Sequence, residues 1–280
     1  MSTVIRIVKL AISFAYHAAD TVLSWFKRLT GVAPQPICTI LYYHAVDDRK
    51  HFGKQMDIVA RCTRPISIDK PELMVSGHRY SAITFDDGMR SVLENALPEL
   101  EERRMPCTIF MITNAFGCIP NWLKNADYYR ETSRVMTKEE MLHVHSDLVT
   151  FGSHTVTHPD LTRISGAQMY TELHDSRIEL EKLLGCPVRT FSFPHGAYNE
   201  AVVALCRKAG YERVFSILPF STTLDETEYV TGRVWANPED WNVEIYLKAV
   251  GAYRWLPKAL MVIQKVTKRD APKRPQIQGV

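Results

Sequence analysis

The sequence predicts an α/β fold with a mainly parallel sheet, on two observations. Apolar segments of strand length alternate with segments of helical spacing along most of the chain, and no internal repeat is visible. The 280 residues are 46% hydrophobic and 23% charged, which is the usage of a globular protein and excludes a disordered, collagen-like or coiled-coil chain. Strands that alternate with helices form βαβ units, and these units require parallel strands.

The predicted strands are short apolar segments followed by polar residues. The first, ICTILYY, covers residues 37–43 after the spacer GVAPQP. Five further segments of this kind are expected at 80–85, 107–112, 148–152, 189–193 and 211–217. In α/β folds the residues that follow such strands form the active site.

Apolar spacing and cap residues predict the helices between these strands. Thr137 and Glu140 form a capping box at the start of a helix that is expected to end near Asp147. Asn199 caps a later helix, which is expected to end at Gly210. The remaining helices are expected at 52–60, at 91–104 with Pro98 inside it, and at 166–184.

The N-terminal segment, residues 1–30, is predicted to be an amphipathic helix. Its apolar sequence is interrupted every three or four residues by a polar stripe made of Arg6, Lys9, Ser13, His17, Asp20, Ser24 and Lys27. A bilayer span needs roughly 20 uninterrupted apolar residues, so a transmembrane helix is disfavoured. Two placements stay open: the helix lies on a membrane surface, or it packs on the protein's own core.

Charge and cysteine usage limit the partners and the compartment. The net charge of +3 is too small to favour nucleic acid as a partner. The basic C-terminal segment, residues 251–280, is expected to be a helix and a proline-rich tail that would suit an anionic lipid surface. The six cysteines include no CxxC pair, so buried free thiols in a reducing, cytoplasmic compartment are expected.

Two polar groups that follow strands have the composition of a metal site. Asp86 and Asp87 follow one strand, and His154 and His158 follow another. Alone, the first pair is a turn and the second a pair of surface histidines. Together, two histidines and a carboxylate make a catalytic metal set that leaves positions open for water and substrate.

A third group, FPHGAY, also follows a strand. Pro194 and Gly196 predict a tight turn around His195. The same loop could present a backbone N–H to a developing oxyanion, which would place these residues against the substrate.

The motifs TFDDG, HTVTH and FPHGAYN, in that order and each after a strand, resemble those of the polysaccharide deacetylase family (NodB homology, carbohydrate esterase family 4). The resemblance covers residues 37–245, and LYYHAV is similar to the first strand of the exopolysaccharide deacetylase branch. It implies a distorted (β/α) barrel with fewer than eight strands over residues 37–250. It also implies metal-dependent hydrolysis of N-acetyl groups on amino-sugar units, in exopolysaccharide or glycolipid assembly.

The resemblance also implies residue roles. Asp86 would be the general base, and Asp87, His154 and His158 would hold a divalent metal, usually Zn²⁺. A bound zinc ion lowers the pKa of its water to about 7, and Asp86, left unbound, would take the proton of that water. The backbone N–H of His195 would hold the oxyanion together with the metal.

The chain departs from the family pattern at three places. Ser192 stands where the third motif often carries an arginine, and Asn237 stands where the fourth often carries an aspartate. The C-terminal leucine–x–x–histidine, which would supply the general acid, is missing. His44, at the end of the first strand, is the candidate proton donor, with His195 as the alternative; a capping or packing role is the other interpretation of His44.

Three function hypotheses follow. The first is a deacetylase of N-acetylated polysaccharide or oligosaccharide. The second is a deacetylase or deformylase of a lipid-linked sugar at the cytoplasmic membrane face, and the third is a non-catalytic carbohydrate-binding relic. Exposed aromatic rings would bind the sugar, and the candidates are Trp122, Tyr128, Tyr129, Trp235 and Trp241.

Overall fold

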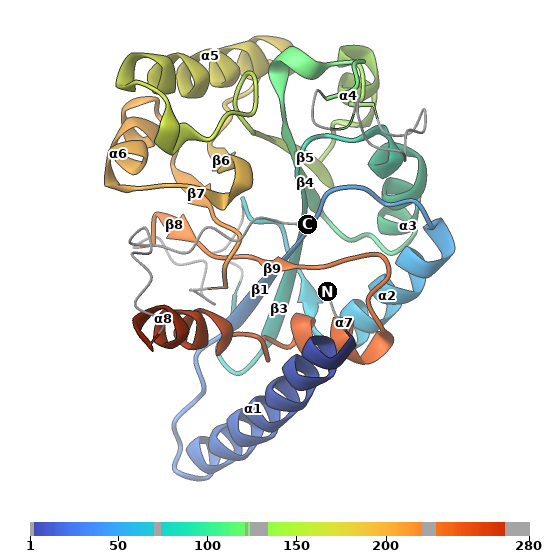
Figure 1. Cartoon of the computed structure of the whole chain (residues 1–280). Helices are drawn as coiled ribbons and strands as arrows, with labels where there is room; N and C mark the ends of the chain where they lie inside the picture. Colours follow the sequence, from blue (N-terminus) through green and yellow to red (C-terminus); the bar gives the residue numbers. More distant parts are fainter. Residues whose placement is uncertain (1–2, 70–73, 121–122, 124–133, 220–227, 267–280) are drawn as a thin grey trace.

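The computed structural model describes residues 3–69, 74–120, 123, 134–219 and 228–266 (Figure 1). Its centre is a parallel sheet of nine strands, in the order β8-β7-β6-β5-β4-β3-β1-β9, with β2 paired to β3. The strands are β1 (Ile37–Tyr43), β2 (Arg64–Pro65), β3 (Arg79–Phe85), β4 (Cys107–Met111), β5 (Val149–Ser153), β6 (Thr190–Ser192), β7 (Arg213–Phe215), β8 (Val230–Thr231) and β9 (Val234–Trp235).

The sheet is curled and open, as the predicted distorted barrel requires. Six of the nine strands have three or more residues, fewer than the eight of a complete barrel. The two ends of the sheet are β8 and β9, and only Gly232 and Arg233 connect them in the chain. The seam of the barrel is therefore crossed by a two-residue link.

Helices surround the sheet (Figure 1). They are α1 (Thr3–Leu29), α2 (Arg49–Cys62), α3 (Leu97–Glu102), α4 (Lys138–Val144), α5 (Gly166–Leu184), α6 (Glu200–Lys208), α7 (Asn242–Ala249) and α8 (Leu256–Val266). A π-helix, η2 (Val92–Ala96), and the 3-10 turns η3 (Thr113–Ala115), η5 (Leu161–Arg163) and η6 (Pro194–Gly196) complete the set. None of the helices formed by the described residues has the length and apolarity of a bilayer-spanning segment.

All six predicted strands are present, and both predicted cap residues act as expected. Thr137 and Glu140 form the capping box of α4, and the Asn199 side chain accepts from Val202 N–H at the start of α6. Several boundaries differ from the expected ones: α2 is longer than 52–60, β7 is shorter than 211–217, and α4 ends at Val144, because His145 has an extended backbone conformation. The helix expected over 91–104 is divided, and Pro98 lies in the first turn of α3, where a missing N–H costs no hydrogen bond.

The expectation of buried thiols is right for half of the cysteines. All six are free, and Cys38, Cys107 and Cys206 are buried. Cys118 is exposed, and Cys62 and Cys186 are half-buried, so the prediction was wrong for these three. Scattered spacing excluded a zinc ribbon but could not tell a core position from a loop position.

Gly152, just before the HTVTH motif, lets β5 lie close to side chains of β4 and β6. A Cβ built on Gly152 of β5 would lie 2.5 Å from Phe110 Cδ1 of β4 and 2.7 Å from Thr190 Oγ1 of β6. These distances are too short for any side chain, so glycine is required there.

We therefore expect Gly152→Ala to lower the free energy of unfolding by about 1–3 kcal/mol through overpacking. Gly166→Ala is the matched control, because nothing lies within 4 Å of its Cβ and α5 gains a better helix former. Thermal denaturation of both variants measures the difference. A Gly152→Ala protein as stable as Gly166→Ala would contradict the close approach.

Candidate metal centre

The structure brings Asp87, His154 and His158 together, as the sequence predicted. Asp87 follows β3, and the two histidines follow β5, at the carboxyl ends of strands separated only by β4. Asp87 Oδ1 lies 3.5 Å from Nε2 of His154 and 3.5 Å from Nε2 of His158. One ligand atom from each residue lies within 4.8 Å of the others, a spacing that suits a single ion.

The backbone at this site is held in a rarely populated conformation. Five non-glycine residues among those described have positive φ, and four belong to the three motifs: Asp87 (70°), Thr155 (71°), His158 (60°) and His195 (57°). Each such residue costs on the order of 1–3 kcal/mol and persists only where its surroundings require it. These backbone conformations orient the side chains of the three motifs, and they lower the local stability of the turns.

Hydrogen bonds fix both imidazoles. The Ser192 carbonyl lies 2.8 Å from His154 Nδ1 and can only accept, so Nδ1 carries the proton and Nε2 faces Asp87 with a free lone pair. Glu172 of α5 accepts from the backbone N–H groups of Val156 and Thr157, at 2.8 and 2.9 Å, and so holds the turn that carries His158.

The electrostatics of the three side chains fit a metal site. Burial lowers the pKa of His154, and burial with the nearby His154 and His195 lowers the pKa of His158 to about 2, so both rings are neutral. Burial also raises the pKa of Asp87. Asp87 Oδ1 is buried and has no hydrogen-bond partner among the described residues. A buried acceptor between two neutral imidazoles is a fit for a divalent cation.

Asp86 is paired with a buried arginine. Nη1 and Nη2 of Arg233 donate to Oδ1 and Oδ2 of Asp86, both at 2.8 Å, and Nη2 also donates to Ser192 Oγ at 2.7 Å. Arg233 Nη1 reaches Thr84 Oγ1 of β3 as well, at 3.2 Å. Burial alone would raise the pKa of Asp86, but the charge and the hydrogen bonds of Arg233 outweigh burial and lower the pKa. Asp86 is therefore an oriented, ionised carboxylate.

Arg233 was missed by the sequence reasoning. It forms the link between β8 and β9 and points across the inside of the barrel, whereas the expected position for an arginine holds Ser192. A signal was present, because Arg233 stands alone in the apolar run YVTGRVW and a buried arginine needs a carboxylate partner. The family motif places its arginine at position 192, so an arginine at position 233 was not expected to take that place.

The third motif lies beside the second. The ring of His195 is exposed and packs edge-on against His158, with ring centroids 4.6 Å apart. Pro194 is buried, and Gly196 has φ 63° with no room for a Cβ, which would lie 2.3 Å from Ile217 Cγ1. The predicted tight turn is confirmed, and it brings His195 to the candidate metal centre.

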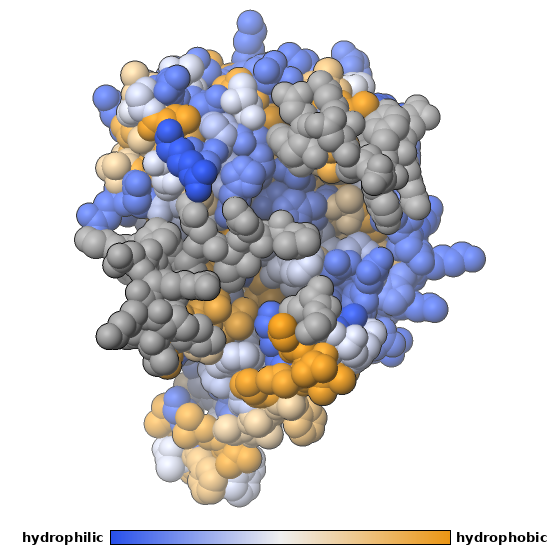
Figure 2. Space-filling model, in the orientation of Figure 1, coloured by the Kyte–Doolittle hydropathy of each residue, from blue (hydrophilic) through white to orange (hydrophobic). Residues whose placement is uncertain are grey.

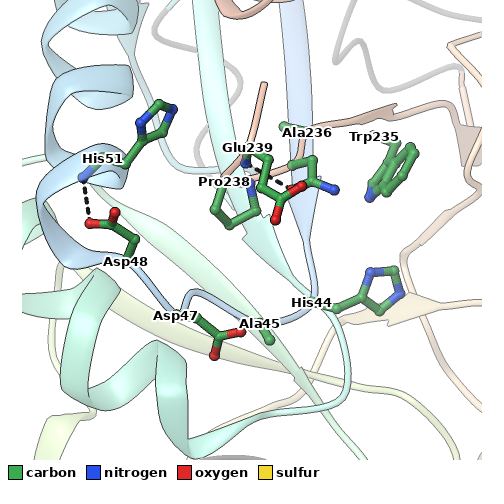
Figure 3. Close-up of a pocket in the computed structure, with 10 residues that line it drawn as sticks. His44, Ala45, Asp47, Asp48, His51, Trp235, Ala236, Pro238 and Glu239 are labelled. Atoms are coloured by element: carbon green, nitrogen blue, oxygen red, sulfur yellow. Dashed lines mark hydrogen bonds between the residues drawn. The ribbon is translucent and has the colours of Figure 1, made fainter. Parts of the chain in front are cut away.

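His44 lines a cavity of about 670 Å³, whose lining residues include none of the three proposed ligands. Tyr43 and Phe85 are paired across β1 and β3, so His44 and Asp86, which follow them, lie at the same edge of the sheet. Figure 3 shows His44 and Trp235 on one side of the cavity and Asp48 with His51 on the other. The remaining wall is the loop of residues 236–239, which contains Asn237 of the altered fourth motif.

Of the five candidate sugar-binding rings, one lies in this cavity. Trp235 is partly exposed and lines the wall. Trp241 is also partly exposed, but the guanidinium of Arg6 covers its ring at 4.1 Å. Trp122, Tyr128 and Tyr129 lie outside the described residues.

We expect Arg233→Met to destabilise the fold by about 3–5 kcal/mol, because Asp86 would be left as a buried charge without its partner. The double variant Arg233→Met/Asp86→Asn should recover most of that loss, since it leaves no uncompensated charge. Denaturant unfolding of both single variants and the double variant measures the coupling. Additive losses would show that the pair carries no interaction of this size.

Comparison with known proteins gives the following findings. Residues 75–214 match the family model described as polysaccharide deacetylase. YxkH of Bacillus subtilis (strain 168) is 28% identical over 156 residues, which are 56% of this chain and 51% of the relative. The poly-beta-1,6-N-acetyl-D-glucosamine N-deacetylase of Staphylococcus aureus (strain MRSA252) is 25% identical over 160 residues, 54% of this chain and 52% of that protein. The chain thus spans about half the length of the curated relatives it matches.

Two solved structures have the same fold. IcaB from Ammonifex degensii superposes with a TM-score of 0.63 at 21% identity, covering 77% of this chain and 99% of that chain. A polysaccharide deacetylase from Bacillus cereus gives a TM-score of 0.62 at 22% identity, covering 76% and 69%. At these identities the likeness concerns the fold alone.

Proposed function

Because the chain belongs to the polysaccharide deacetylase family, we propose that it hydrolyses the N-acetyl amide of amino-sugar units in a polysaccharide or oligosaccharide. One observation carries the proposal: a cluster of three potential metal ligands includes Asp87, while the adjacent carboxylate of Asp86 is hydrogen-bonded to an arginine. The poly-N-acetylglucosamine deacetylase among the relatives supports the same class of substrate.

Asp87, His154 and His158 are the proposed ligands of a divalent metal. One carboxylate oxygen and two imidazole nitrogens suit zinc and leave coordination positions open, as in catalytic sites. When bound, such an ion supplies a water of pKa about 7 and polarises a carbonyl.

Asp86 is the proposed general base. Arg233 donates one hydrogen bond to each of its oxygens, and Ser192 Oγ also donates to Oδ2 at 3.3 Å, so Oδ1 is the oxygen that keeps a second lone pair for a proton. The pair costs basicity, because Arg233 lowers the pKa of Asp86, but it keeps the group ionised and oriented. A general base works best when its pKa lies near the operating pH, so what Arg233 contributes is orientation and not basicity.

His44 is the proposed proton donor to the leaving amine, with His195 as the alternative. Both rings are exposed at the edge of the site, where solvent can reprotonate them. The N–H of His195 remains the proposed oxyanion donor, because its turn lies against His158.

A lipid-linked sugar at a membrane face is a second candidate substrate. The observation that favours it is the exposed apolar side of α1, because a protein on the membrane surface would meet sugars attached to lipid. A non-catalytic binding relic is the third possibility, and it is opposed by the strained, pre-formed ligand cluster, for which sugar binding alone has no use.

We expect Asp86→Asn and Asp87→Asn to have different effects, because the two carboxylates have different proposed roles. Asp86→Asn should keep bound zinc and lose about 10²–10⁴ in kcat, the contribution of a general base, whereas Asp87→Asn should lose both zinc and activity. Zinc analysis and acetate release from chitin and poly-β-1,6-N-acetylglucosamine oligosaccharides, beside lipid-attached N-acyl sugars, give the two readouts. Full activity of Asp86→Asn would reject the base, and a zinc-loaded wild type inactive on the whole panel would favour the relic.

We expect His44→Gln to lower kcat on N-acetyl sugars by about 10²–10⁴ with little change in KM, as loss of a proton donor would. The same variant should keep near wild-type kcat on 4-nitrophenyl acetate, whose leaving group needs no proton. His195→Gln is the comparison. Equal loss of kcat on both substrates would assign His44 a packing role instead.

A further inference from the structure

Helix α1 packs on the protein with its polar side. Its half-buried or buried residues include Arg6, Lys9, Ser13, His17 and Asp20, which are the polar stripe seen in the sequence. Helices that pack on a core normally bury their apolar side. The orientation of α1 is therefore the reverse of the usual one.

The first half of α1 is fixed by Arg6. Its Nε donates to Glu244 Oε2 of α7 at 2.8 Å, and its guanidinium stacks on the Trp241 ring. Arg6 Nη2 also donates to the carbonyl of Glu239, at 3.2 Å. Glu239 lines the same cavity as His44, so α1 touches the wall of that cavity from outside.

Ser13, His17 and Asp20 fix the helix further along its length. Ser13 is fully buried and accepts from the Trp255 indole N–H at 2.9 Å. His17 Nε2 lies 3.1 Å from the Tyr246 hydroxyl. Asp20 pairs with Arg79 at 2.8 Å and with Arg254 at 3.2 Å. These bonds run along the helix and prevent it from rolling its apolar side inward.

The apolar side consequently faces outward. Among the described residues, eleven of the twenty exposed large hydrophobic side chains lie on α1, from Val4 (70% exposed) to Leu29 (64%). Figure 2 shows apolar surface over the part of the molecule where Figure 1 draws this helix. Scattered exposed hydrophobic side chains are ordinary, but a continuous apolar side on one helix marks a binding surface.

We propose that this apolar side of α1 docks on an anionic lipid bilayer, with the helix lying in the plane of the interface. Charge complementarity supports it: Lys27 and Arg28, both exposed, close the last turn of α1, and its first turn contains no acidic residue. Trp25 and Phe26 are exposed at the same end, which suits the headgroup region.

The same charges disfavour a second copy of this chain as the occupant. In an antiparallel helix pair, Lys27 and Arg28 of one copy would meet the N-terminus of the other, which has no acidic residue in its first turn. In a parallel pair the basic ends would lie together. An anionic lipid surface would attract these basic residues whichever way the helix points within the plane of the membrane.

Co-sedimentation of the full chain with vesicles tests the proposal without any sugar, so its failure is distinguishable from failure of the proposed reaction. The vesicles are phosphatidylcholine and phosphatidylserine in about a two-to-one ratio, and phosphatidylcholine alone as the comparison. Ile5→Gln/Val22→Gln should weaken binding at least about tenfold, because two apolar side chains leave the interface. Leu142→Gln/Ile178→Gln is the matched control, since these side chains are similarly exposed on α4 and α5.

The expected result is binding of the wild type and of the control, weaker on the neutral vesicles, with loss confined to the α1 variant. Circular dichroism and zinc content should be the same for all three proteins. A wild type that stays in the supernatant, or an α1 variant that binds like the control, would overturn the proposal. A stable dimer without vesicles that the α1 variant disperses would also overturn it, because the second copy would then cover this side.

Discussion

The contact between Arg233 and Asp86 is the constraint on which the candidate site depends. Two carboxylates adjacent in sequence would both be available to a cation, and the bidentate hydrogen bonds of Arg233 engage one of them, the proposed general base. Arg233 comes from the link between the two ends of the open sheet, so the closure of the barrel and the division of labour between Asp86 and Asp87 have the same cause. A charge pair this deeply buried is stable only as a pair.

Backbone strain is concentrated in the motifs that surround this pair. Asp87, Thr155, His158 and His195 have backbone conformations that L-residues avoid, and the bonds from Glu172 and Ser192 hold two of the turns in place. The orientation of α1 also depends on polar contacts. Its polar stripe holds the helix to α7 and to the C-terminal segment, and its apolar side is therefore exposed.

Sequence reasoning recovered what short-range patterns determine. The strands, the caps at Thr137 and Asn199, and the convergence of Asp87 with the two histidines follow from periodicity and from the rule that parallel strands end at one edge. It missed β2, β8 and β9, because two-residue strands have no period, and it also missed the helix α7. It missed Arg233 because the partner of this residue lies 147 positions away. It identified the polar stripe of α1 but could not tell which side of the helix packs on the protein. The polar side can form hydrogen bonds and ion pairs there, and the apolar side can pack on a hydrophobic core.

Anomalous diffraction at the zinc absorption edge, on crystals of the zinc-loaded protein, tests the central claim most directly. The account predicts one ion within about 2.0–2.2 Å of Asp87 Oδ1 and one nitrogen of each of His154 and His158, with Asp86 still paired to Arg233. An ion bound by Asp86, or a site that leaves out either histidine, would contradict it.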